Sequence, residues 1–231
     1  MATIQSNVPA PNAASGLQGW ERYVHAPHFR TADDEFDACK LGFWLFLTTE
    51  VLLFAGLFVS YAIFRMLYPD AFAAGSHLLD WRFGFINTIV LLVSSFTIAM
   101  AIRNCQKGQY TWSIINLLIT IGCALAFLFI KFTFEYGPKW AQGKRPGALF
   151  DYPFSTTANE PLWWSVYYCA TGIHALHVVI GMGLLTWCLV RQIRTRQYGP
   201  GHYTMVEMSG LYWHLVDLIW IFLFPLLYLI H

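Results

Sequence analysis

Residues 41–64, LGFWLFLTTEVLLFAGLFVSYAIF, form an almost unbroken apolar stretch that decides the fold. A helix rises about 1.5 Å per residue, so these 24 residues are long enough to cross the hydrocarbon core of a bilayer. The only acid in the stretch is Glu50, near its middle. A carboxylate at that depth costs a few kcal/mol to insert, so a specific interaction must keep Glu50 there.

Further apolar runs of spanning length follow at 83–102, 112–134, 162–190 and 208–230. The composition agrees with a membrane protein, because 57% of residues are apolar and only 12% are charged, about half the share typical of soluble domains. We therefore expect an all-α membrane protein, a five-transmembrane-helix bundle over residues 31–231. Residues 1–30 are rich in Ala, Pro, Asn and Ser and predict a mobile tail without a cleaved signal peptide.

The distribution of Lys and Arg predicts the orientation of the bundle. Eight of them lie in the tail, at Lys40 and in the loops 103–111 and 191–207, whereas six lie on the opposite side, counting Lys131. Short loops decide orientation, and the 191–207 loop carries three arginines close to a helix end. We expect the N-terminus inside and the C-terminus outside. The formal charge of +1 gives no reason to expect a nucleic-acid partner.

Few ionisable residues fall within or at the ends of the spans, and they define the candidate site. They are Glu50, Glu135, His174, His177, His214 and Asp217. Positions three apart share a helix face, so the two histidines of the fourth span point one way, as do His214 and Asp217. The simplest interpretation is that these side chains join helices by hydrogen bonds. The alternative is a cofactor site or a proton path.

Catalytic and metal-binding roles find little support in the sequence. His174 and His177 share a face and cannot clamp one haem between them, although either one with His214 could do so in principle. Zinc needs three or four close ligands, and the five cysteines include no CxxC pair. No nucleophile lies next to a base. We therefore expect no catalytic residue, no metal site and no cofactor in this chain.

The surroundings of Glu50 on its own helix are apolar. Its neighbours three, four and seven positions away are Phe43, Phe46, Leu47, Leu53, Phe54 and Leu57. Because desolvation favours the neutral acid, we expect Glu50 to be hydrogen-bonded, with a hydroxyl on a neighbouring helix as the expected partner.

Four motifs, in order along the chain, resemble the cytochrome oxidase subunit III family. They are KLGFWLFLTTE at 40–50, EY at 135–136, TGIHALHV at 171–178 with RQ at 191–192, and YWHLVDLIW at 212–220. The longest members of the family have seven helices, whereas this chain is expected to have five. The chain is therefore similar to the short bacterial members. The loop 137–161 is also longer than in most relatives, and its aromatic residues suggest an outer-face partner.

The resemblance implies a non-catalytic subunit III of a haem–copper oxidase in the bacterial inner membrane. Haem and copper would then belong to partner subunits I and II, and this chain would support sustained proton uptake. It also implies that Arg191 and His177 contact phospholipid headgroups. The alternative is a free-standing carrier or channel that uses Glu50 as an ion site, which would need several charged groups to converge at mid-membrane.

Overall fold

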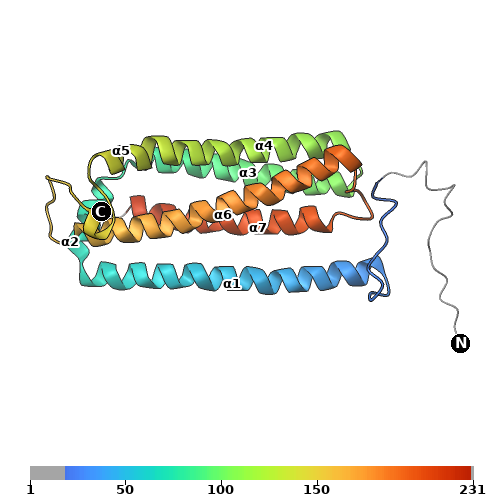
Figure 1. Ribbon diagram of the computed structural model, residues 1–231, viewed down its shortest axis with the longest axis horizontal. Helices are drawn as coiled ribbons and strands as arrows, with labels where there is room; N and C mark the ends of the chain where they lie inside the picture. The colour runs from blue at the N-terminus through green and yellow to red at the C-terminus, as the bar shows by residue number, and fades with distance from the viewer. Residues whose placement is uncertain (1–18, 230–231) are drawn as a thin grey trace, which may run out of the picture.

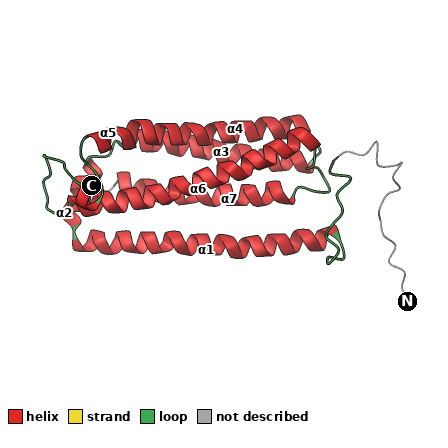
Figure 2. Cartoon of the chain, viewed as in Figure 1, coloured by secondary structure: helices red, strands yellow, loops and turns green. Residues whose placement is uncertain are grey.

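The computed structural model describes residues 19–229, which form helices joined by loops and include no β-strand (Figures 1 and 2). The expected mobile tail at 1–30 lies largely outside the described residues. So does the last residue of the expected span 208–230.

Within residues 19–229, five helices are long and apolar enough to cross a membrane, which confirms the predicted number. They are α1 (Ala32–Leu67), α3 (Trp81–Gln106), α4 (Tyr110–Ile130) with its continuation, α6 (Glu160–Thr195) and α7 (Thr204–Tyr228). α4 continues through a π-helical segment, Lys131–Tyr136, into the short helix α5 (Gly137–Ala141). The expected loop 137–161 therefore begins as helix.

The start of α1 follows from its sequence. The side chain of Thr31 accepts a hydrogen bond from the backbone N–H of Asp34, at 3.1 Å. The first turn also carries Asp33, Asp34 and Glu35, whose negative charges interact favourably with the positive N-terminal end of the helix dipole. α1 accordingly begins before the apolar stretch, as the sequence predicts.

α3, α4, α6 and α7 form a four-helix bundle. α3 packs on α4 and α7, and α6 packs on the same two helices, so α3 and α6 occupy opposite corners. α1 packs along α7 at the side of this bundle (Figure 1). It is the least buried of the five, with 11% of its most apolar window buried against 56% for α7. Most of the surface of α1 is therefore open to lipid or to another subunit.

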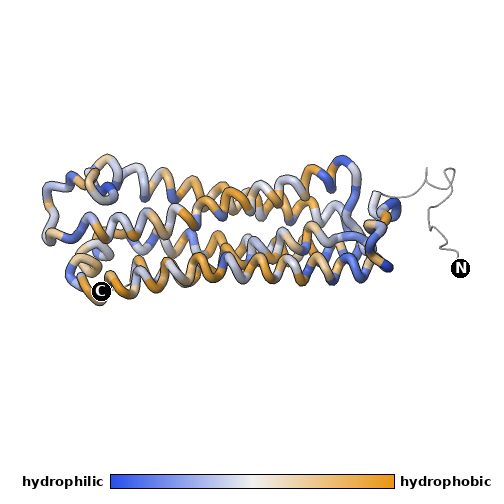
Figure 3. The backbone as a smooth tube through the Cα atoms, turned by 60° about the horizontal axis from the view of Figure 1, so that its bottom comes forward, coloured by the Kyte–Doolittle hydropathy of each residue, from blue (hydrophilic) through white to orange (hydrophobic). Residues whose placement is uncertain are grey.

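Hydrophilic residues gather at the two ends of the elongated bundle, and apolar residues occupy its middle (Figure 3). α1 begins at one end and α7 finishes at the other (Figure 1). This pattern is the one expected when the long axis of the bundle lies across a membrane.

The short helix α2 (Pro69–His77), between α1 and α3, is absent from our sequence-based expectation. It buries Phe72 against the end of the bundle, and the Cα of Gly75 lies so close to Trp163 that a Cβ there would approach its ring to 2.0 Å. A helix this short has no membrane-spanning signal, and packing against the bundle stabilises it instead.

Candidate functional site

Glu50 of α1 and His177 of α6 form a hydrogen-bonded pair. His177 Nε2 lies 2.8 Å from Glu50 Oε2, and its Nδ1 lies 2.7 Å from the carbonyl oxygen of Ile173. A carbonyl only accepts, so Nδ1 carries a proton and donates it. The bond between Nε2 and Glu50 then contains one proton. It belongs either to a neutral acid facing a neutral imidazole or to an imidazolium facing a carboxylate.

Aromatic rings enclose this pair. Phe54 meets the His177 ring edge-on at 5.0 Å between centroids, and Tyr212 stacks beside it at 6.4 Å. The side chains of His177 and Glu50 remain 11% and 17% exposed. The pair therefore lies at the margin between α1 and α6, where a proton can be shared in apolar surroundings.

The partner of Glu50 differs from the hydroxyl that we expected from the sequence. The hydroxyls of the two residues that precede Glu50 in the sequence, Thr48 and Thr49, donate to carbonyls of their own helix. The sequence could not identify His177, because it does not reveal which levels of α1 and α6 lie side by side.

His214 and Asp217 of α7 face two adjacent serines of α3. Ser95 Oγ lies 2.6 Å from His214 Nδ1, and Ser94 Oγ lies 3.4 Å from Asp217 Oδ2. The indole N–H of Trp213 also donates to Ser94, at 3.0 Å. These contacts join α3 to α7, and they include no direct bond between His214 and Asp217.

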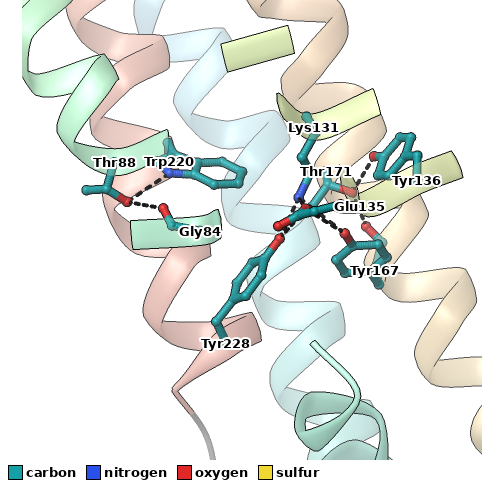
Figure 4. Close-up of polar contacts among 9 residues, drawn as sticks. All are labelled: Gly84, Thr88, Lys131, Glu135, Tyr136, Tyr167, Thr171, Trp220 and Tyr228. Carbon is teal, nitrogen blue, oxygen red and sulfur yellow. Dashed lines mark hydrogen bonds and ion pairs between the residues drawn. The ribbon is translucent and has the colours of Figure 1, made fainter. Parts of the chain in front are cut away.

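Glu135 lies in a buried cluster at the far end of α4 (Figure 4). Lys131 donates to Glu135, to Tyr167 at 3.2 Å and to Tyr228 at 2.6 Å. Both phenols in turn donate to Glu135, at 3.1 and 2.6 Å. Lys131 also lies 4.9 Å from the centre of the Trp220 ring. The cluster joins the π-helical segment to α6 and α7.

Sequence reasoning missed the role of Lys131, which we counted among the basic residues of the outer face. The spacing of four residues between Lys131 and Glu135 is the signal that could have revealed it, because such positions are neighbours on a helix. The ion pair is buried, with exposed side-chain fractions of 1% and 2%.

His174 takes a different direction from His177, although the two are three residues apart. Its ring is fully buried in the centre of the four-helix bundle, 5.2 Å from the ring of Trp220 and 5.7 Å from that of Phe127. The residues therefore do not act as a pair. Within residues 19–229, no group of three or more His, Cys, Asp or Glu side chains could hold a metal ion.

Arg191 lies at the end of α6 beside a basic cavity of about 820 Å³. Its guanidinium lies 5.2 Å from the Trp187 ring and donates to Gln197 at 3.3 Å. Arg194 lines both this cavity and an adjoining, mostly apolar groove, which Trp187 and Val190 also line. This arrangement offers positive charge next to an apolar channel on the helix surface.

Comparison with known proteins agrees with this fold. The family model described as cytochrome c oxidase subunit III matches residues 27–231. Quinol oxidase subunit 3 of Bacillus subtilis is 32% identical over 201 residues, covering 82% of this chain and 85% of the relative. Cytochrome c oxidase subunit 3 of Papio hamadryas is also 32% identical, over 82% of this chain and 68% of the relative. A protein of Aeropyrum pernix named heme-copper oxidase subunit I+III is 29% identical, over 84% of this chain and 23% of the relative.

The fold defines a multi-pass helical membrane protein whose polar groups tie its helices together. With the match across almost the whole length, the chain belongs to the cytochrome c oxidase subunit III family.

Proposed function

We propose that this chain is the accessory subunit III of a proton-pumping haem–copper oxidase in the bacterial inner membrane. The match to the family over residues 27–231 is the observation that carries the proposal. The name of the Aeropyrum relative joins subunits I and III in one chain, which supports a position beside the oxygen-reducing subunit. In this proposal haem and copper belong to partner subunits I and II, and this chain takes no redox step.

The exposed face of α1 supports contact with another membrane subunit. Leu45, Leu52 and Val59 are 65%, 66% and 58% exposed. Such a continuous apolar face suits a partner helix or lipid. At the other end of the bundle, Leu149 and Phe154 are 59% and 76% exposed, which supports the 137–161 loop as a contact for an outer-face partner.

Co-purification tests the accessory role. An affinity tag on this chain should recover haem-containing partners from solubilised membranes, with the haem absorbance in proportion to the tagged chain. Recovery of the folded chain alone would favour the carrier or channel that uses Glu50, and the proposal would be wrong.

We also propose that Arg191 and its adjoining groove bind a phospholipid. A guanidinium can hold a phosphate through two hydrogen bonds, while an acyl chain lies along Trp187 and Val190. His177 uses both ring nitrogens within the protein, so headgroup binding rests on Arg191 and Arg194. Arg191→Ala should lower the phospholipid retained by the purified protein, whereas Arg145→Ala, on the opposite side, should not. Equal retention would contradict the lipid site.

Sustained proton uptake is the role that we propose for the Glu50–His177 pair. A bond that can hold its proton on either partner suits a group that moves a proton without a change in net charge. Glu50 of this pair lies on α1, the helix most open to another subunit.

A further inference from the structure

Two buried polar side chains in the centre of the four-helix bundle have no partner among the described residues. Asn87 of α3 and His174 of α6 are both 0% exposed. Neither amide atom of Asn87 and neither ring nitrogen of His174 has a hydrogen-bond partner within residues 19–229. Buried polar groups are costly when unpaired, and in native proteins nearly all are satisfied by protein or by ordered water.

These two residues lie in one layer of the bundle. The indole N–H of Trp220 donates to Thr88, the neighbour of Asn87, at 3.1 Å (Figure 4), and the Trp220 ring lies 5.2 Å from His174. Phe127 meets both Trp220 and His174 edge-on, at 4.9 and 5.7 Å. Each of the four helices therefore contributes one side chain to this layer.

The register of α3 against α4 supports the same placement. Phe83 stacks on Phe134 at 5.3 Å, and Thr97 lies 2.8 Å from Thr120 by their hydroxyl oxygens. These contacts fix the antiparallel pair at two points, and Asn87 then lies level with the last turn of α4. Asn87 and His174 are both fully buried, so each lies on the inner side of its helix at this level of the bundle.

The neighbouring Lys131 cannot serve as their partner. An ammonium has three N–H groups, and those of Lys131 already donate to Glu135, Tyr167 and Tyr228. Its positive charge, 4.9 Å from the centre of the Trp220 ring, also disfavours a metal cation in this layer.

We propose that Asn87 and His174 bind ordered water between them, in a hydration site at the centre of the bundle. The amide offers one acceptor and a donor group, and a neutral imidazole offers one of each. Water, which both donates and accepts, matches this set and satisfies two to four polar partners in buried sites. The bridge joins α3 to α6, the two helices at opposite corners.

A double-mutant cycle on the full chain in lipid nanodiscs tests the site. Asn87→Leu and His174→Phe should each lower the melting temperature by on the order of 4 °C, because each leaves the other group and its water short of partners. The double variant removes both polar groups, so its loss should be clearly smaller than the sum of the two single losses. Asn116→Leu, which removes an amide bonded to its own helix at Trp112, should add its effect independently to that of His174→Phe.

Additive losses for Asn87→Leu and His174→Phe would overturn the proposal. If a variant fails to fold, a density map of the unmodified protein, at a resolution that shows water, provides a second test. Water within hydrogen-bond distance of both side chains is expected. A direct bond between Asn87 and His174, or an apolar contact without water, would contradict it.

Discussion

The proton shared between Glu50 and His177 makes Glu50→Gln an informative change at the scale of one residue. The Gln amide can donate to a neutral Nε2, so the hydrogen bond and the thermal stability should persist. The amide cannot release a proton, so the number of turnovers before inactivation should fall if the pair supports proton uptake. Glu50→Leu, which removes both functions, should also lose about 1–3 kcal/mol of stability. An unchanged turnover lifetime in Glu50→Gln would leave only a structural role.

Lys131 is the residue whose loss should destabilise the chain most. Lys131→Met leaves the Glu135 carboxylate buried without its cation, and breaking a buried ion pair from one side costs about 3–5 kcal/mol. Adding Glu135→Gln should recover part of that loss, because the amide is neutral and still accepts from Tyr228. Thermal unfolding of the purified chain measures both. A Lys131→Met protein as stable as the unmodified one would show that the ion pair contributes nothing.

The pH dependence of the N-terminal segment should follow His202, in the loop before α7. Its ring stacks on Tyr23 at 3.6 Å, and burial lowers the pKa of His202 while the charge of Glu35 partly opposes this. The unfolded chain then binds a proton at higher pH than the folded one. The stability from neutral His202 is therefore complete above about pH 6.5 and is lost as the pH falls through that value toward the lowered pKa.

Limited proteolysis near Arg22 measures this effect, because release of Tyr23 exposes the segment. Cleavage of the unmodified chain should accelerate relative to His202→Phe as the pH falls from 7.5 to 5.5 (roughly one unit either side of the histidine value). Phe keeps a stacking ring without a titrating group, so it is the matched control. The same pH profile in both proteins would rule out His202 as the cause.

At the scale of elements, two glycines of α6 give opposite expectations. A Cβ at Gly181 would lie 2.8 Å from the Trp213 ring, whereas a Cβ at Gly183 would meet nothing within 4 Å. Gly181→Ala should therefore push α6 from α7 and destabilise the chain by about 1–3 kcal/mol. Gly183→Ala should be neutral or stabilising by up to about 1 kcal/mol, since Ala favours the helix. The melting temperatures of the two variants measure this difference. Equal values would contradict the close packing of α6 on α7 at Gly181.

The same scale separates what the sequence could predict from what it could not. Apolar length alone predicts the five long helices, because a bilayer demands it. α2 and the π-helical Lys131–Tyr136 carry no such signal, and tertiary contacts stabilise them. The hydrogen-bonded side-chain pairs that join two helices are still harder to predict from the sequence. Ser94 and Ser95 are adjacent polar residues within the second apolar run, but pairing them with Asp217 and His214 needs the register of α3 against α7, which only packing sets.

At the scale of the whole molecule, the orientation of the bundle in the membrane stays a prediction. The positive-inside pattern expects the 191–207 loop and the N-terminal side of α1 in the cytoplasm, with the 142–159 loop outside. Labelling of single cysteines can test this orientation. Cys105 is buried and therefore a poor position for labelling, and Gly147 has a φ of +56° that a cysteine would rarely adopt. Exposed Lys107 and Leu149, near opposite ends of the bundle, are better positions.

Single cysteines at these two positions should report opposite sides of the membrane. In a background in which the exposed Cys39 and Cys169 are replaced by Ala, Leu149→Cys should react with an impermeant maleimide in cells whose outer membrane has been permeabilised. Lys107→Cys should react only after the inner membrane is also opened, because its loop would face the cytoplasm. Reaction in the reverse order would show that the arginines at the C-terminal end of α6 do not set the orientation. The basic residues of the opposite side, among them Lys139, Lys144 and Arg145, would then mark the cytoplasmic face.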